Sequence, residues 1–105
     1  MIKHILRTHQ GDKLEFDIHL QEVPEVAPRV REPRELYAGE TVFFETDSDP
    51  SGNKISITQD DLHFVIDEVL LTPGQYPFRA GLNLSDGTRQ IVFDSDESVL
   101  VVRRD

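Results

Sequence analysis

Oxygen-bearing side chains alternate around a glycine in the stretch ETDSDPSGNKIS, residues 45–56, an arrangement that could bind a calcium ion. An EF-type calcium loop takes side-chain ligands from positions 1, 3, 5 and 9 and a bidentate glutamate from position 12. With Asp47 at position 1 the early positions are filled, but position 9 is Ile55 and position 12 is Thr58. The tetrapeptide DPSG, in contrast, has the aspartate, proline and glycine that a type I turn prefers. We therefore predict a turn at residues 49–52 and no specific metal site at residues 47–53.

A second group of possible metal ligands alternates along one predicted strand and consists of Glu15, Asp17 and His19. Alternate residues of a strand lie on one face and can share an ion. No accompanying pattern supplies the outer partners that orient metal ligands, so the sequence favours a solvated polar face. The four histidines lack the helical spacing and the cysteine company of zinc sites. We predict neither a metal nor another cofactor.

The serines, carboxylates and glycines show no catalytic pattern. No serine has the Gly-x-Ser-x-Gly context of a nucleophile elbow, and no carboxylate pair stands out by its spacing. No glycine-rich loop opens a helix to hold phosphate. The chain has no cysteine, which excludes a thiol nucleophile, a thiolate zinc site and a disulfide framework. We expect that the chain is not an enzyme.

The charge of the chain limits its partners. Twenty acidic residues against eleven basic ones give a net charge of −9, the wrong sign for binding nucleic acid or an anionic membrane. No apolar run approaches the length of a membrane span, and the N-terminal MIKHILRTHQG is too short and polar for a signal peptide. We expect a single domain, residues 1–105, that is made in the cytosol.

The elements that position these residues are predicted to be β-strands, because alternation with a period of two dominates. In KLEFDIHL, residues 13–20, apolar and polar residues alternate, and QYPFRAGLNL, residues 75–84, repeats the pattern. Shorter β-branched or aromatic runs are TVFFE (41–45), KISIT (54–58), LHFVID (62–67), RQIVF (89–93) and SVLVV (98–102). No segment sustains a helical period.

Turn residues separate these runs and indicate the fold class. SDGT, residues 85–88, predicts a type I′ hairpin, and TPGQ, residues 72–75, predicts a type II turn. Short strands with turns every eight to twelve residues or so are typical of a β-sandwich. We predict an all-β fold, an immunoglobulin-like β-sandwich of about seven to eight antiparallel strands. Its predicted core contains Leu14, Phe16, Ile18, Tyr76, Phe78, Leu82 and Ile91.

Tyr76 precedes the inward-facing Phe78 by two residues. This spacing fits the tyrosine corner of immunoglobulin-like sandwiches, in which a tyrosine hydroxyl binds nearby backbone. It fits equally an ordinary half-buried tyrosine. Both interpretations stay open at the level of sequence.

The segment QEVPEVAPRVREPRE, residues 21–35, contains three prolines and predicts an extended loop or arm. Its valines have no regular period that would bury them, and its arginines are close together in an acidic chain, which suits the acidic surface of a neighbouring copy. Our hypothesis is that the arm binds a partner, and a solvated loop is the alternative. The predicted contact residues are Val23, Val26, Arg29, Val30, Arg31 and Arg34.

Taken together, five stretches resemble the small immunoglobulin-like domains of tailed bacteriophages, of which the N-terminal domain of the phage baseplate upper protein is the type. They are QGDKLEFDIHL (10–20), ELYAGETVFF (35–44), DPSGN (49–53), LTPGQYPFRAGLNLSDGTRQ (71–90) and SVLVVRRD (98–105). The resemblance covers nearly the whole chain and rests on turn residues and alternation. It departs at LYAG, residues 36–39, which is one residue longer than the usual step, and at the long, charged three-proline segment.

The resemblance implies a non-enzymatic virion structural role, in a tail, baseplate or neck. The implied partners are other virion proteins or copies of the chain itself, forming a homo-oligomer in the assembled particle. The implied locations are the virion and, during assembly, the host cytoplasm. One alternative is a carbohydrate- or receptor-binding β-sandwich module, which would need exposed aromatic side chains. The candidates for that role are Tyr37, Phe43 and Phe64. Another is a bacterial adhesin or periplasmic sandwich, which would need export.

Overall fold

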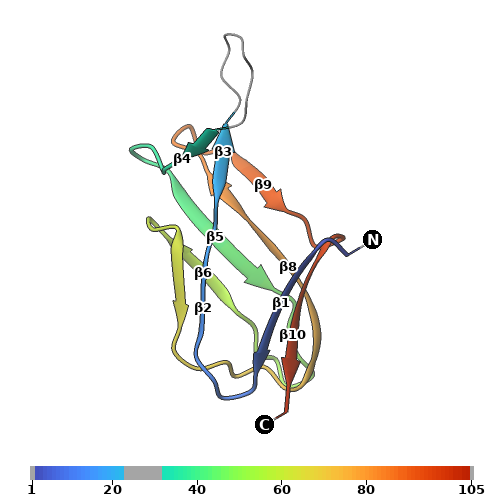
Figure 1. Cartoon of the computed structure of the whole chain (residues 1–105). Coiled ribbons are helices and arrows are strands. Elements are labelled where there is room, and N and C mark those ends of the chain that lie inside the picture. Colours follow the sequence, from blue (N-terminus) through green and yellow to red (C-terminus); the bar gives the residue numbers. More distant parts are fainter. Residues whose placement is uncertain (1, 23–31, 105) are drawn as a thin grey trace.

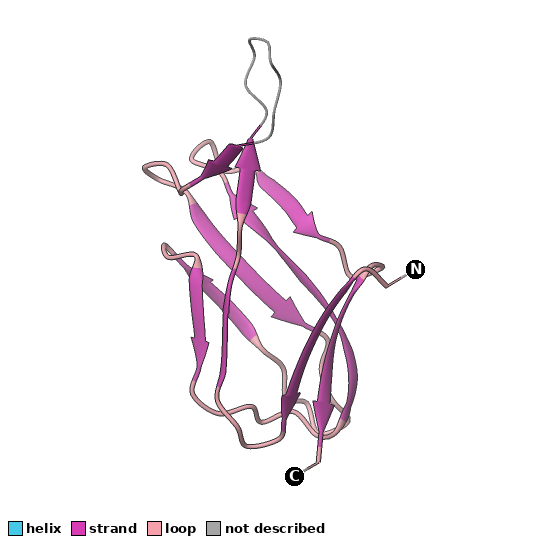
Figure 2. Cartoon of the chain, in the orientation of Figure 1, coloured by secondary structure: helices cyan, strands magenta, loops and turns pink. Residues whose placement is uncertain are grey.

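The computed structural model describes residues 2–22 and 32–104, which form ten β-strands and no helix (Figures 1 and 2). The strands are β1 (His4–His9), β2 (Leu14–Asp17), β3 (Leu20–Glu22), β4 (Glu32–Arg34), β5 (Thr41–Thr46), β6 (Ser56–Gln59), β7 (His63–Ile66), β8 (Gly74–Asn83), β9 (Arg89–Phe93) and β10 (Ser98–Arg103). The all-β prediction is confirmed. None of the described residues belongs to a helix that could cross a membrane.

Among the described residues the largest sheet has six strands, in the order β1-β10-β8-β5-β6, with β9 also paired to β8. Residues 74–77 of β8 pair with β10 and residues 80–83 pair with β9, so β9 and β10 follow one another along one side of β8. β1 lies parallel to β10, whereas the other strand pairs are antiparallel. The prediction of antiparallel strands throughout is therefore wrong. Nearly the whole chain separates β1 from β10, and such a long connection permits parallel pairing.

The strands β2 and β7 form a separate antiparallel pair that packs over the large sheet through aromatic rings. The ring of Phe44, on β5, has its centroid 4.9 Å from that of Phe16 and 6.1 Å from that of Phe64. Phe16 and Phe64 stack at 5.1 Å across the β2–β7 pair. The core of the molecule therefore lies between the β2–β7 pair and the large sheet.

Most of the predicted core is confirmed. Five of its members are buried and Phe16 is partly buried against them; the five are Leu14, Ile18, Tyr76, Phe78 and Leu82. The assignment of Ile91 to the core is wrong, because this residue is 42% exposed. A bulge in the β8–β9 pairing places Phe93, and not Ile91, against the core. The predicted strand at residues 13–20 is also split, since β2 ends at Asp17 and β3 begins at Leu20.

A hairpin joins β8 to β9 as predicted, but its turn is not type I′. Gly87 has a φ of 91°, whereas Asp86 has a negative φ, and a type I′ turn needs positive φ at both. The Leu84 N–H donates to the Thr88 carbonyl at 2.7 Å, and the Gly87 N–H donates to the Leu84 carbonyl at 3.0 Å. These bonds form a three-residue loop with glycine in the left-handed region. Asp86 stabilises it by accepting hydrogen bonds from the N–H and hydroxyl of Thr88.

The predicted type II turn at residues 72–75 is wrong. Such a turn needs a φ near about +80° at its third residue, but Gly74 has a φ of 159° and begins β8. The Thr72 carbonyl, which would close the turn, accepts a hydrogen bond from the Tyr76 hydroxyl at 2.6 Å. The side chain of Tyr76 therefore bonds to the backbone four residues upstream, and this contact replaces the turn.

Candidate functional site

The predicted partner-binding arm is described only at its two ends. β3 and β4 pair antiparallel, with Gln21 opposite Pro33 and Glu22 opposite Glu32. This hairpin lies at the end of the molecule where β5 begins and β8 ends (Figure 1). Arg34 belongs to β4, and the other predicted contact residues lie outside the described residues: Val23, Val26, Arg29, Val30 and Arg31. β3 and β4 are therefore the two strands of a hairpin.

Asp49 links its own turn, residues 49–52, to the loop that contains Thr72, and the residue is only 5% exposed. Its Oδ1 accepts hydrogen bonds from the N–H groups of Ser51 and Asn53, and its Oδ2 accepts from the Thr72 N–H at 3.1 Å. Burial opposes ionisation of this carboxyl, but the N–H donors of Thr72 and Asn53 outweigh it and lower the pKa of Asp49. The Gly52 N–H donates to the Asp49 carbonyl at 3.0 Å, which confirms the predicted turn.

A charged cluster spans the polar face of the β2–β7 pair and contains Lys13, Glu15, Asp17 and His63. His63 Nδ1 lies 2.7 Å from Asp17 Oδ1, and His63 Nε2 lies 3.3 Å from Glu15 Oε2. The imidazole brought to Glu15 and Asp17 is thus that of His63, from the partner strand, and not that of His19. The hydrogen bond to Asp17 and the charge of both carboxylates raise the pKa of His63. The hydrogen bond from Lys13 lowers the pKa of Glu15.

This cluster can form ion pairs and respond to pH. Within residues 2–22 and 32–104, no three or more His, Asp or Glu side chains are grouped so that they could hold a metal ion. All of the cluster's side chains are about half exposed. Exposed pairs of this kind contribute little to stability individually.

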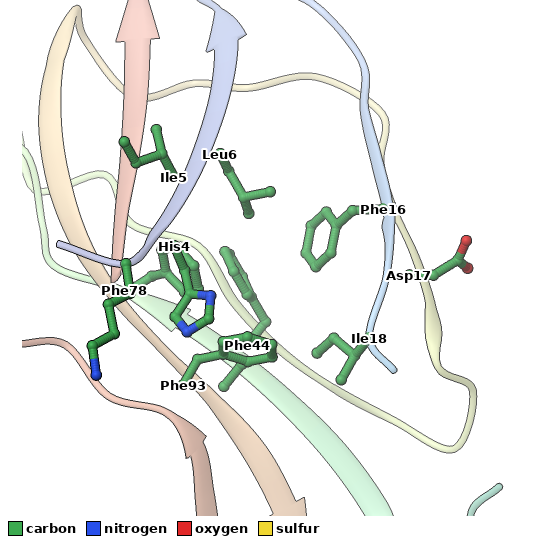
Figure 3. Close-up of a pocket in the computed structure, with 11 residues that line it drawn as sticks. His4, Ile5, Leu6, Phe16, Asp17, Ile18, Phe44, Phe78 and Phe93 are labelled. Atoms are coloured by element: carbon green, nitrogen blue, oxygen red, sulfur yellow. The ribbon is translucent and has the colours of Figure 1, made fainter. Parts of the chain in front are cut away.

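An apolar cavity of about 350 Å³ opens between β1 and β2 (Figure 3). Its walls are mainly apolar and come from both sheets: Leu6, Phe16, Ile18, Phe44, Phe78, Ala80 and Phe93. Two of its polar residues have partners elsewhere, since Lys3 lies 3.3 Å from Glu97 and Asp17 binds His63. The His4 ring packs edge-on against Phe93 in the cavity wall, with 4.8 Å between the ring centroids. The Asp17 carboxylate points away from the cavity (Figure 3). The cavity can therefore accommodate apolar groups, and sequence patterns missed it because its residues also read as ordinary core.

Of the three aromatic residues considered for carbohydrate stacking, two are buried. Phe43 and Phe64 are each 0% exposed, whereas Tyr37 is 55% exposed. Phe43 lies on the outer face of the large sheet, where the Arg89 guanidinium covers it at 3.8 Å from the ring centroid. The prediction that Phe43 and Phe64 are exposed is wrong, because outward-facing Phe43 is covered by a side chain and Phe64 faces the inter-sheet core.

No family model matches the chain, and no curated protein and no solved structure is significantly similar to it. The expected relationship to tailed-phage domains therefore rests on the sequence pattern alone.

Proposed function

We propose that the chain is an immunoglobulin-like β-sandwich that serves as a non-enzymatic structural module of a bacteriophage or prophage virion. Its place is a tail, baseplate or neck, and its role is protein–protein assembly. Two sets of observations support this proposal. One concerns the order of the strands, and the other concerns the β3–β4 hairpin.

The strand order supports the immunoglobulin-like fold. In that fold a tyrosine near the start of strand F bonds upstream backbone, strand F lies between C and G, and strand B pairs with E. Tyr76 near the start of β8 makes such a bond, and β8 lies between β5 and β10. β2 pairs with β7 in the second layer. Assigning β2, β5, β7, β8 and β10 to strands B, C, E, F and G matches the C–F–G order of one layer and the B–E pair of the other.

The observation that carries the assembly role is the β3–β4 hairpin, whose two strands lie at one end of the molecule (Figure 1). This hairpin lies in the connection between β2 and β5, the position of the B–C loop, and loops of that end of the sandwich bind partners on a rigid scaffold. The turn at residues 37–40 lies against the β8–β9 loop, since a Cβ on Gly39 would lie 3.2 Å from Ser85. The turn at residues 37–40 and the β8–β9 loop therefore lie at the same end of the molecule as the β3–β4 hairpin.

Charge supports a partner that is a copy of the chain or another acidic protein. Residues 21–35 contain four acidic and three basic residues, so 16 acidic and 8 basic residues remain of the 20 and 11 in the chain. The rest of the molecule is thus strongly acidic, whereas residues 21–35 are close to neutral, and their three arginines can pair with acidic groups of a second copy. Complementary charge of this kind guides association and orientation.

The test replaces residues 23–31 with glycine and serine at equal length, leaving β3 and β4 in place. A matched control combines Leu70→Ser and Lys54→Ser, an exposed apolar and an exposed basic residue outside the hairpin. Sedimentation velocity should show that the segment variant loses the largest assemblies formed by the parent, while both variants keep the parent's melting temperature. A segment variant that assembles as the parent does would show that the hairpin is not an assembly element.

A further inference from the structure

The strand β9 (Arg89–Phe93) presents an apolar edge. β9 pairs with β8 on one side, and no other strand of residues 2–22 and 32–104 pairs with it. Ile91 is 42% exposed and Val92 is 39% exposed. β9 contains neither lysine nor proline, and its one charged residue, Arg89, stands at its first position and leaves the middle of the edge apolar. An exposed apolar edge of this kind is a template for another strand.

A bulge sets the faces of β9. Ala80 is opposite Phe93 and Gly81 is opposite Ile91, so Val92 is the extra residue. The β9 backbone lies so close to β8 that a Cβ on Gly81 would be 2.0 Å from the Gln90 carbonyl oxygen. The bulge turns Phe93 toward the core and leaves Ile91 and Val92 exposed together at the middle of the edge.

Opposite charges flank this apolar centre. Arg89 begins β9, and its guanidinium lies 3.3 Å from Glu45, which also lies 3.5 Å from Arg79. The single Glu45 carboxylate therefore pairs with both the Arg79 and the Arg89 guanidinium, which leaves a net positive charge at this end of β9. Asp94 follows β9 directly and is exposed. Arg89 and Asp94 are equally distant in sequence from the midpoint between Ile91 and Val92, so the edge is complementary to itself when reversed.

We propose that β9 binds β9 of a second copy of this chain, antiparallel and about a two-fold axis through the centre of the edge. Arg89 of each copy then lies opposite Asp94 of the other, and Ile91 lies opposite Val92. A two-fold interface requires this self-complementarity, and the added strand also pairs the backbone groups of the edge. The inference is independent of the virion role, and it gives a closed dimer that the variant lacking segment 23–31 should still form.

Charge reversal tests the pairing. Arg89→Glu and Asp94→Arg each place like charges opposite one another twice, so each should weaken dimerisation at least about tenfold, the effect of one lost charge pair. An equimolar mixture of the two variants should dimerise again, because both contacts of the mixed dimer join opposite charges. Asp60→Arg, a reversal at an exposed loop residue, is the control and should dimerise as the parent does.

Sedimentation velocity over a concentration series measures these states. A monomeric parent, or single variants that dimerise as strongly as the parent, would overturn the proposal, as would a mixture that stays monomeric. If loss of the Arg89 stack on Phe43 unfolds Arg89→Glu, Val92→Lys provides the second variant. It places a lysine at the centre of the edge and should abolish the dimer, and a dimer that persists would equally overturn the proposal.

Discussion

Truncation of Phe44 to alanine should be the most destabilising single change in the inter-sheet core. Its side chain is 0% exposed and its ring contacts Phe16, Phe64 and Phe78, the last at 5.0 Å. A buried Phe→Ala change costs about 3–5 kcal/mol, which is a large part of the roughly 5–15 kcal/mol that stabilises a small domain. With a urea slope of about 1–3 kcal/mol/M, the unfolding midpoint should fall by about 2 M.

Urea unfolding followed by circular dichroism is the suitable assay, because the chain has no tryptophan to serve as a fluorescent probe. Phe44→Leu keeps most of the volume and should cost less than about 1.5 kcal/mol. Leu70→Ala, at a residue that is 60% exposed, is the surface control and should change stability by less than about 0.5 kcal/mol. A loss below about 1 kcal/mol for Phe44→Ala would refute the inter-sheet position of this ring and, with it, the register of β5.

Two further predictions concern a hydrogen bond and a titrating group. Tyr76→Phe removes the donor to the Thr72 carbonyl and should cost about 1–2 kcal/mol in urea unfolding, whereas a loss under about 0.3 kcal/mol would show that this bond contributes nothing. The hydrogen bond to Asp17 raises the pKa of His63 above its ordinary 6.5, so protonated His63 stabilises the fold. This stabilisation is complete below pH 6.5 and is lost as the pH rises through the raised pKa. Melting temperatures of the parent and of His63→Gln should therefore converge as the pH rises, and a constant difference would contradict the assignment.

Alternation predicted most strands because a half-buried strand repeats with a period of two, and RQIVF coincides with β9. The sequence pattern does not indicate β1, because its apolar residues Ile5 and Leu6 are adjacent and do not alternate with polar ones. Its parallel pairing with β10 depends on contacts across the chain that no local pattern records. The Asp-Gly hairpin was predicted correctly, but the predicted type I′ turn is wrong, since the side chain of Asp86 favours the longer loop through its bonds to Thr88.

The residues of the candidate sites were less accessible to sequence reasoning. Asp17 meets His63 only because β2 and β7 pair in the register that places them opposite one another. The exposure of Ile91 follows from the hairpin register that places it opposite Gly81, and the burial of Phe93 depends on a single extra residue, Val92. Both features arise from tertiary pairing, which a single sequence does not encode in its local period.

The virion role is tested most directly by asking whether the chain is part of a particle. Particles purified from a culture that encodes the chain, through two successive density gradients, should contain it at a constant ratio to the major structural proteins, as quantified by mass spectrometry. The chain should stay with the particles after a high-salt wash, because an assembly element is bound between subunits and not adsorbed by charge alone. A chain that is expressed in the lysate but absent from the washed particles would contradict the proposed function.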